Sequence, residues 1–306
     1  MTSELAVGSR HEGYRQAGYA QSLSQFGHPR ALEGAGTWIL ERAIPDAGGP
    51  RDAIGCYPIL ACRDWGRLPG ELEELESDLV SMSFVSDPFA DLDVTWMREW
   101  LDVARPFKEH LVLDLSLNAD AIVTRHHRYY TRKALRTVSV EISERPLDHA
   151  REWTGLYAHL IERHQIEGIR SFSPAAFEAQ LALDGMVMLR CLEEGEAIAA
   201  HLWLLQDDVA YSHLAASTPR GYEVGAAYAI YDRAISHFQG KASWVNFGSG
   251  TEPIGAPADG LAKFKRGWSS GTRTAYLCGK ILQPSLYQEL SRGIDTSFFP
   301  AYRQAL

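Results

Sequence analysis

The fold is decided by Ala197-Ile-Ala-Ala-His-Leu-Trp-Leu-Leu205, Gln206-Asp-Asp208 and Val209-Ala-Tyr-Ser-His-Leu-Ala-Ala216. The first and third segments are rich in residues typical of β-strands, and the polar middle segment is typical of a turn, so we expect a β-hairpin. Pro219-Arg-Gly-Tyr-Glu-Val-Gly225 follows as a turn and opens onto a helix whose apolar residues continue to Phe238. Such a turn leaves backbone N–H groups unpaired at the start of the helix, and these groups bind anions. The stretch therefore predicts a phosphate-binding turn.

The chain beyond this helix contains a second recognisable order of parts. Trp244-Val-Asn-Phe-Gly-Ser-Gly250 is a short apolar strand broken by glycines, and Gly260-Leu-Ala-Lys-Phe-Lys-Arg-Gly-Trp268 follows it. The polar segment between them contains Pro253, Gly255, Pro257 and Asp259. This order resembles the GNAT-like acyltransferases of the FemAB and BioF2-like branch, in which a glycine-ended strand precedes Gly-Leu-x-x-Phe-Lys-x-Gly. The resemblance covers roughly the last two thirds of the chain.

The resemblance implies an α/β (α+β) protein of tandem GNAT-like lobes, each a mostly antiparallel mixed sheet flanked by helices. The expected first lobe, residues 1–118, is degenerate. The second, residues 119–306, carries the acyltransferase site, and the boundary is expected near Ser116 to Ala121. The expected elements of the second lobe are helices at 153–164, after Ser173-Pro174 and at 284–292, and strands at 186–192, 197–205, 209–216 and 272–279.

The N-terminal part alternates between strand and helix patterns. The segments 37–42, 53–61 and 111–116 are typical of strands, whereas 71–79 and 92–104 carry apolar residues at helical spacing. We expect Phe84-Val-Ser-Asp-Pro-Phe89 to be a loop. Strands that alternate with helices indicate an α/β layer.

Composition and charge limit the classes of function. The 306 residues are 45% hydrophobic and 23% charged, which is typical of a globular protein. A net charge of −9 disfavours a dedicated nucleic-acid binder, because phosphate-backbone binding requires a basic surface. No apolar run is long enough to span a membrane, and the polar start Met1-Thr-Ser-Glu-Leu5 does not have the order of a secretory signal. We therefore expect a cytoplasmic protein without membrane contact.

The residues that bind metals or act as nucleophiles show no known spacing. Four cysteines occur without a C-x-x-C pair and are expected to be buried as small apolar residues, namely Cys56, Cys62, Cys191 and Cys278. The eleven histidines include no H-E-x-x-H pattern. Neither G-x-x-x-x-G-K-[ST] nor G-x-S-x-G occurs in the chain. We expect no metal site.

The most basic stretch is Arg125-His-His-Arg-Tyr-Tyr-Thr-Arg-Lys-Ala-Leu-Arg136. On a helix, Arg128 and Arg132 share one stripe, so their guanidinium groups can converge on a polyanion. The alternative is a solvated basic helix that pairs with surrounding acids. Relatives in the FemAB-like group carry a similar arginine-rich helix after a strand, which implies that Arg128 and Arg132 bind a phosphate of the donor or a charged group of the acceptor.

The turn before the long helix corresponds to the pyrophosphate turn of GNAT enzymes, which is written Q/R-x-x-G-x-G/A. The matching residues here are Tyr222-Glu-Val-Gly225-Ala-Ala227, with tyrosine where the family has Gln or Arg. The resemblance implies that coenzyme A is bound around Arg220, Gly221, Gly225 and Ala227. An ordinary helix cap is the alternative, because a single glycine also ends helices.

The resemblance places the Phe-Lys pair at the reacting centre, and the match here is Phe264-Lys265. An ammonium group at Lys265 can stabilise the negative charge of a tetrahedral intermediate, and its removal would cost about a few kcal/mol of transition-state stabilisation. Phe264 would pack against the acyl or acceptor group. In the alternative interpretation, Lys263, Lys265 and Arg266 only solvate a short helix.

Polar residues on the predicted strands are candidates for the proton transfer and for the acceptor site. His213 is the candidate general base, because a histidine near its ordinary pKa can take the proton of an amine at neutral pH. The other candidates, for contacts with the substrate, are His201, Tyr211 and Asn246. Buried histidines and aromatic residues at such positions also serve as packing residues. Other open possibilities are Glu223 or Asp259 as the base, and Tyr211 or Tyr228 as donors to a leaving thiolate.

Three functions from different classes remain open from the sequence. The first is an N-acyltransferase that moves an acyl group from acyl-CoA to the amine of a small acceptor, such as an amino sugar or an amino acid derivative. The second keeps the fold but takes the acyl group from aminoacyl-tRNA, as in relatives that build peptidoglycan cross-bridges. The acidic charge and the lack of a long helical-hairpin arm weaken it. The third is a non-catalytic, two-lobed binding protein.

Overall fold

The computed structural model describes residues 11–45, 47–165, 168–251, 254, 257 and 259–304. The chain forms two compact units. Unit 1 comprises Met1–Gly13, Leu111–Thr251 and Ala258–Thr272, and unit 2 comprises Tyr14–His110, Glu252–Pro257 and Arg273–Leu306. This division differs from the single boundary near residue 118 that we expected from the sequence. The final residues join the N-terminal ones because the last strand pairs with a strand of unit 2, a long-range pairing that local sequence patterns do not encode.

Unit 1 is built on one mixed sheet. Its strands are the end of β6 (Val103–Asp114) together with β1 (His11–Glu12), β7 (Ser139–Ser143), β8 (Met186–Glu193), β9 (Glu196–Asp207), β10 (Val209–Ser217) and β11 (Trp244–Asn246). Its helices are α4 (Ala119–Ile122), α5 (Arg125–Ala134), α6 (Ala150–His164), α7 (Pro174–Leu181), α8 (Pro219–Val224), α9 (Ala226–Phe238) and α10 (Gly260–Arg266). The strands run in the order β7-β8-β9-β10-β11-β6, and every neighbouring pair is antiparallel except β10 with β11.

The register of the β9–β10 hairpin fixes which side chains share a face. Ser212 lies opposite Trp203 and Leu214 lies opposite Leu202, so His213 is an extra residue at a β-bulge. Beyond the bulge Ala215 lies opposite His201. Because a bulge changes the alternation of a strand, the faces of residues beyond it cannot be assigned from a simple two-residue period.

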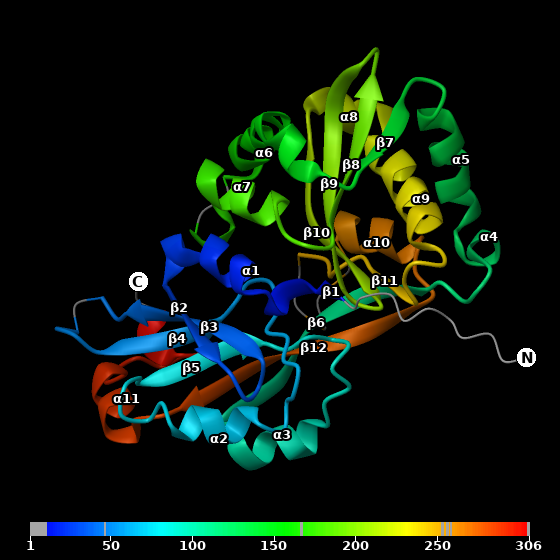
Figure 1. The fold of residues 1–306 in the computed structure, drawn as a ribbon. Helices are drawn as coiled ribbons and strands as arrows, with labels where there is room; N and C mark the ends of the chain where they lie inside the picture. The colour runs from blue at the N-terminus through cyan, green and yellow to red at the C-terminus, as the bar shows by residue number, and fades with distance from the viewer. Residues whose placement is uncertain are drawn as a thin grey trace, which may run out of the picture. The chain divides into compact units, whose positions relative to one another are not determined.

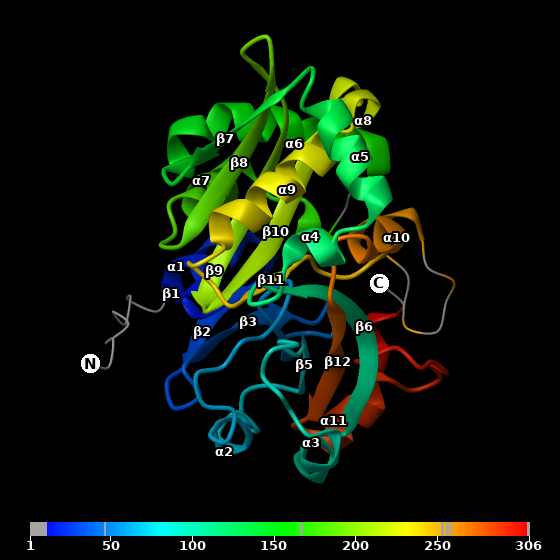
Figure 2. The same ribbon diagram turned by 90° about the vertical axis from the view of Figure 1, so that its right-hand side faces the viewer.

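Helices cover both faces of this sheet. Figure 1 shows α6 and α7 on one side of β7–β10 and α5 and α9 on the other, and in Figure 2 α9 crosses in front of the strands. The α9 face is filled by apolar side chains of the strands, among them Leu189, Trp203 and Ala210, which pack against Ile230 and Phe238 of α9. The α6/α7 face packs Trp153, Tyr157 and Phe177 into an aromatic cluster. Both faces of the sheet are therefore buried.

Unit 2 has its own mixed sheet, in which the strands run in the order β2-β3-β4-β5-β12-β6. Its strands, besides the first part of β6, are β2 (His28–Leu32), β3 (Thr37–Ala43), β4 (Arg51–Gly55), β5 (Ser81–Val85) and β12 (Gly271–Ile281). Its helices are α1 (Ala17–Ser22), α2 (Leu68–Glu73), α3 (Val94–Trp100) and α11 (Pro284–Leu290). Helices α2 and α3 pack on one face of the sheet through Leu72 and Met97, and α1 lies on the other (Figure 1).

A buried carboxylate attaches the end of the chain to unit 2. The Asp52 side chain is fully buried and accepts hydrogen bonds from the guanidinium groups of Arg42 and Arg303, at 2.8 to 3.2 Å. The Tyr302 hydroxyl donates to the same carboxylate at 3.2 Å and also contacts the Ser81 hydroxyl. A buried charge is tolerated when it is paired and hydrogen-bonded in this way.

The structure confirms the expected hairpin and its following helix, and it corrects the N-terminal part. The segment 84–89 is not entirely a loop, because β5 extends to Val85. The strand expected at 53–61 ends at Gly55, and the helix expected at 71–79 is α2, which ends at Glu73. Pro253 and Gly255, which were expected in a polar segment, lie outside the described residues.

Candidate active site

A cavity of about 390 Å³ lies in unit 1, on the α9 side of the hairpin. Its walls come from β9, β10, α8, α9 and α10. The residues that line it are mostly apolar or small, namely His201, Ala215, Ala216, Ser217, Gly221, Tyr222, Gly225, Ala227, Tyr228, Tyr231, Gly260, Leu261 and Phe264. Ligand pockets of this size and apolar character are typical of small-molecule and cofactor sites.

Two glycines shape the wall between β10 and α9. The Thr218 hydroxyl caps α8 by accepting a hydrogen bond from the Gly221 N–H at 3.1 Å. A Cβ atom at Gly221 would lie 2.5 Å from the Ile198 carbonyl oxygen, so only glycine lets α8 approach β9 this closely. Gly225 has a φ of +75°, which ends α8 and starts α9. The sequence thereby brings the N-terminus of α9 to the cavity.

The imidazole of His201 is the buried polar group in the cavity wall. The residue is 4% exposed, and its Nδ1 atom has no hydrogen-bond partner in the part of the chain that the structure describes. Burial lowers the pKa of His201 to about 3, and the positive charge of Lys265 contributes to the decrease. The ring packs edge-to-face on Tyr231, with centroids 5.5 Å apart. The cavity wall therefore contains a neutral imidazole whose buried Nδ1 has no partner among the described residues.

Aromatic rings form the side of the cavity next to α9. Tyr228 packs on Phe264 with ring centroids 4.9 Å apart, and its hydroxyl lies 3.4 Å from Nε2 of His126. Tyr231 packs on the same Phe264 ring at 5.0 Å. Burial raises the pKa of Tyr231 well above its ordinary value, so this hydroxyl stays protonated. These rings exclude water from a ligand in the cavity.

Lys265 lies beside the cavity and not in its lining. Its Nζ atom donates a hydrogen bond to the Ser249 carbonyl at 2.7 Å, in the glycine turn that follows β11. Burial lowers the pKa of Lys265 to about 8, although Asp259 acts in the opposite direction. Its neighbour Phe264 does line the cavity. The ammonium group is thus directed into the protein, close enough to His201 to lower the pKa of its imidazole.

The structure places His213 away from the cavity, on the α7 side of the sheet. Its ring lies toward α7, where Nε2 is 3.2 Å from Oε1 of Gln180. Burial lowers the pKa of His213 to about 3. The general-base role of His213 stays a prediction, and the structure places its ring against Gln180, outside the cavity lining.

Tyr211 and Asn246, expected at the acceptor site, are also outside the cavity lining. Tyr211 pairs in register with Leu204 on β9 and with Asn246 on β11. Oδ1 of Asn246 accepts a hydrogen bond from the Gly248 N–H at 2.8 Å and so holds the glycine turn. In this position Asn246 shapes the turn that Lys265 contacts.

The predicted phosphate-binding arginines are not in the cavity lining either. Arg220 forms two hydrogen bonds with the Glu193 carboxylate, at 2.7 and 2.9 Å. Arg128 donates to the Val123 carbonyl at 2.6 Å and to the Asp120 carbonyl. Arg132 is exposed on α5. By contrast, the small residues predicted from the same turn, namely Gly221, Gly225 and Ala227, do line the cavity.

Several lining residues were not singled out from the sequence. Ala215 could have been found from the hairpin register, because it lies opposite His201. Tyr231 could have been found from its spacing, because Gly225, Tyr228 and Tyr231 recur every three residues and so share one side of α9. Leu261 carried no such signal.

Two features, a metal-binding group of side chains and a membrane-spanning helix, are absent from the described part of the chain. No group of three or more His, Cys, Asp or Glu side chains in the described part of the chain could hold a metal ion. Within the same ranges, no helix has both the length and the apolar character that crossing a bilayer requires.

Comparison with known proteins identifies the type of fold. Residues 123–266 match the family model of the acetyltransferase (GNAT) domain. No protein of curated function matches the chain in sequence. Three solved structures are similar to it, and each covers most of both chains. FemX is 13% identical, and the match covers 89% of this chain and 93% of FemX with a TM-score of 0.65. The C-terminal domain of a protein assigned as a lysylphosphatidylglycerol synthetase from Agrobacterium fabrum is 15% identical, with 87% of this chain and 88% of that chain covered and a TM-score of 0.64. L-PGS from Bacillus licheniformis is 13% identical, with 88% of this chain and 93% of that chain covered and a TM-score of 0.60.

These likenesses establish a FemAB-like GNAT fold, with mixed sheets flanked by helices, as the resemblance in the sequence implied. At such low identities the solved structures define the fold alone. The matched family segment contains β9, β10, α9 and α10, so it includes all residues that line the 390 Å³ cavity.

Proposed function

We propose that the chain is an acyltransferase that moves an acyl group from acyl-CoA to the amine of a small acceptor, because residues 123–266 match the family model of the acetyltransferase (GNAT) domain. An amino sugar or an amino acid derivative is the expected acceptor class. The observation that carries the proposal is the apolar cavity in the matched segment, to whose lining His201 contributes. An acyl chain fits the apolar lining, and the imidazole of His201 is suited to a polar reacting group.

His201 is proposed to position the acceptor amine. In acyl transfer the amine nitrogen attacks the thioester carbonyl carbon, the C–S bond breaks, and the proton that the amine loses ends on the departing coenzyme A thiolate. With a pKa of about 3, the imidazole is neutral near pH 7 and does not protonate the amine. Its Nδ1 lone pair can accept an N–H of the amine, which directs the nitrogen lone pair at the carbonyl carbon. His201 therefore acts by orientation.

Lys265 is proposed to act through His201 and through the glycine turn. Its charge helps to keep the imidazole neutral, and its hydrogen bond to the Ser249 carbonyl holds the turn beside the cavity. This role differs from direct stabilisation of the tetrahedral intermediate, because the ammonium group is outside the lining.

The donor is proposed to bind across Gly225 and Ala227. Gly225 is the residue before α9, a helix of 13 residues, Ala227 lies in its first turn, and both residues line the cavity. Backbone N–H groups at the start of a helix bind phosphate oxygens. Tyr228 and Leu261 then lie where an acyl or pantetheine chain would follow. We place the reaction in the cytoplasm, where acyl-CoA is available.

A coupled binding and turnover experiment tests the proposal. Acetyl-CoA and longer acyl-CoA donors are incubated with a panel of amines, and acylated products are detected by mass spectrometry. Thermal stabilisation by coenzyme A and amine-dependent consumption of a donor are expected. If no acyl-CoA stabilises the protein or is consumed with any amine, coenzyme A is not the donor.

An aminoacyl-tRNA donor is a second candidate, favoured by one surface. The side chains of Arg125 and Arg132 on α5 and of Arg136 just after it are exposed, and none forms an ion pair with any residue in the described ranges. Such a basic face can contact phosphates of a nucleic acid. Binding of tRNA that weakens steeply with salt, together with loss of this binding in Arg132→Gln, would favour this donor over coenzyme A.

A further inference from the structure

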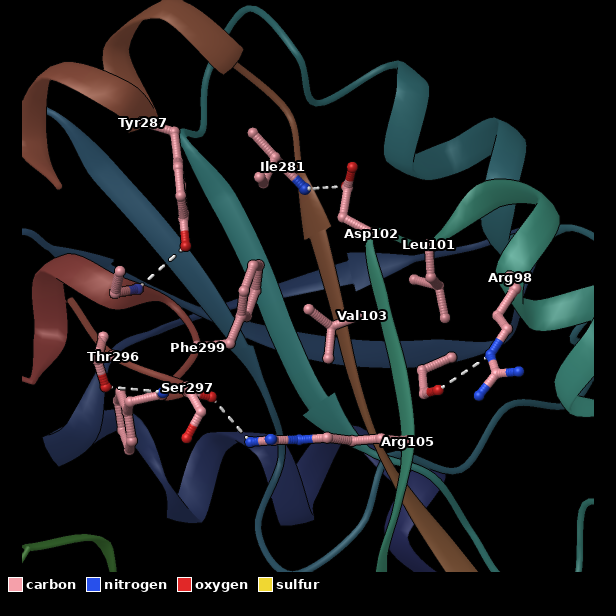
Figure 3. A pocket seen from close by; sticks show the side chains of 13 residues that line it. Arg98, Leu101, Asp102, Val103, Arg105, Ile281, Tyr287, Thr296, Ser297 and Phe299 are labelled. Carbon is pink, nitrogen blue, oxygen red and sulfur yellow. Dashed lines mark hydrogen bonds between the residues drawn. The ribbon is translucent and has the colours of Figure 1, made fainter. Parts of the chain in front are cut away.

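A second cavity, of about 690 Å³, lies in unit 2 and shares no residue with the cavity of unit 1. It is an open cavity bordered by the end of α3, the start of β6, the end of β12, α11 and the segment 296–301 (Figure 3). Its volume is within the range of sites for drug-sized ligands. Neither the acetyltransferase match nor the proposed function uses it.

Two arginines in its lining have donors to spare. Nε of Arg98 donates to the Ala104 carbonyl at 3.4 Å, and an Nη atom of Arg105 donates to the Ser297 carbonyl at 3.0 Å (Figure 3). Neither guanidinium group forms an ion pair with a carboxylate in the part of the chain that the structure describes. A guanidinium group has five N–H donors, so each arginine keeps several for a ligand. The backbone bonds hold the two groups in place.

The arginines of this cavity differ from others in unit 2. Arg42 and Arg303 are both paired with the buried Asp52 carboxylate. The one acidic side chain among the described residues that line the cavity is Asp102, and its carboxylate accepts the Ile281 N–H at 2.7 Å (Figure 3). The lining therefore carries two guanidinium groups against one carboxylate. This excess of positive charge favours an anionic ligand.

The opposite side of the cavity is aromatic and held in position. The ring of Phe298 is 52% exposed, and that of Phe299 stacks on Tyr287 with centroids 5.8 Å apart. The Phe298 N–H donates to the Thr296 hydroxyl at 2.9 Å, and the Ala301 N–H donates to the Tyr287 hydroxyl at 3.0 Å. With the bond from Arg105, side chains fix this segment at three points. An exposed ring on a fixed segment is suited to contact with a flat apolar group.

We propose that this cavity binds a small organic anion in which a phosphate or carboxylate is attached to a flat apolar body. Arg98 and Arg105 bind the anionic group, and Phe298 contacts the body. The inference is independent of the acyl-transfer proposal, because the two cavities have no residue in common.

Calorimetric titration of the full chain with four probes tests the proposal. Phenyl phosphate and benzoate combine the anion with a ring, inorganic phosphate lacks the ring, and benzyl alcohol lacks the charge. We expect saturable binding of phenyl phosphate or benzoate with a Kd below about 1 mM, and at least tenfold weaker binding of the other two probes. Tighter binding of phenyl phosphate assigns a phosphate ligand, and tighter binding of benzoate assigns a carboxylate.

Three variants locate the binding. Arg98→Gln and Arg105→Gln keep a side-chain donor for the backbone carbonyls and remove the charge, so each is expected to weaken binding at least tenfold. Arg292→Gln, at an exposed arginine outside the cavity, is the matched control and is expected to change Kd less than twofold. Circular dichroism verifies that each variant is folded. The proposal is overturned if no probe saturates below about 10 mM, or if both cavity variants bind like the control.

Discussion

The two faces of the unit 1 sheet carry two histidines that are nearly equal in burial and differ in their surroundings. His201 is 4% exposed and His213 is 7% exposed, and burial lowers the pKa of each to about 3. His213 contacts Gln180 on the α7 face, whereas Nδ1 of His201 has no partner within the described residues and lies at a cavity.

The difference teaches that a perturbed pKa does not by itself identify a functional histidine. Burial is the main cause of the lowered pKa at both positions, because it disfavours the charged imidazole wherever the ring lies, and at His201 the charge of Lys265 adds to it. The state of the remaining nitrogen separates the two residues, since a buried polar atom without a partner costs free energy unless a ligand satisfies it. The following predictions test this distinction in order of decreasing effect.

The largest expected effect is on catalysis by His201→Leu. Removal of the nitrogen that orients the amine should lower kcat/KM about 100-fold or more, which corresponds to about 2.8 kcal/mol of transition-state stabilisation. The stability of the variant should stay equal or increase, because an unpartnered buried polar atom is replaced by an apolar group. Activity is measured by acyl-donor consumption, and unfolding by urea titration. Activity within threefold of the unmodified protein would show that His201 has no catalytic part.

The reciprocal variant His213→Leu should show the opposite pattern. It leaves Oε1 of Gln180 without the imidazole donor in a buried position, so the free energy of unfolding should fall by about 1–3 kcal/mol. Activity at a temperature where the variant is folded should stay within about threefold. An activity loss as large as that of His201→Leu would mean that the reaction takes place on the α7 face of the sheet, contrary to the proposal.

Filling the cavity from β10 should act on donor binding. Ala215 is an exposed residue that lines the cavity opposite His201, so Ala215→Phe occupies ligand space without disturbing the core. We expect the KM for the acyl donor to increase about tenfold, with an unchanged unfolding midpoint. An unchanged KM would mean that the donor binds elsewhere.

Acid should destabilise the protein through both histidines alike. The ordinary pKa of 6.5 applies in the unfolded chain, and the folded value is about 3 for each. Between these values the unfolded state binds more protons, so stability falls as the pH decreases from about 6.5 toward about 3. His201→Leu and His213→Leu should each reduce this decrease by a similar amount in urea titrations at several pH values. A clear difference between the two variants would show that their environments are not equivalent in burial.

The smallest expected effect concerns Lys265→Met. Loss of the ammonium charge should raise the pKa of His201, but by less than burial lowers it, and NMR titration of the imidazole measures the change. The folded pKa of Lys265 is about 8 and its ordinary value is 10.5, so the unfolded state binds more protons between these values and stability increases with pH there. The variant should lack this increase. An unchanged pKa of His201 would show that the charge of Lys265 does not act on the imidazole in the cavity wall.

Local pattern was sufficient to predict the hairpin 197–216, because strand residues and a polar turn occur in direct succession. It also directed attention to five residues that line the cavity, namely His201, Gly221, Gly225, Ala227 and Phe264. Their roles stay predictions. The faces of the residues beyond His213 could not be predicted, because a β-bulge adds a residue without a signal in the alternation of the strand.

Long-range pairing accounts for the other differences. The Arg220 guanidinium is paired with Glu193, which lies 27 positions earlier and is brought close only by the folded sheet. Strand β12 pairs with β5, which lies about 190 residues earlier in the chain. This pairing puts most of β12 and the residues after it in unit 2 and not in the second lobe expected from the sequence. No local spacing reports such contacts.

The most direct test of the cavity's function is NMR of the protein with 15N-labelled histidine, titrated with a non-reactive acyl-CoA analogue. The account predicts that the Nδ1 resonance of His201 moves and saturates, while the resonances of His213 stay unchanged because its ring lies on the other face of the sheet. A saturating analogue that shifts His213 and leaves His201 unchanged, or an analogue that shifts neither, would contradict it.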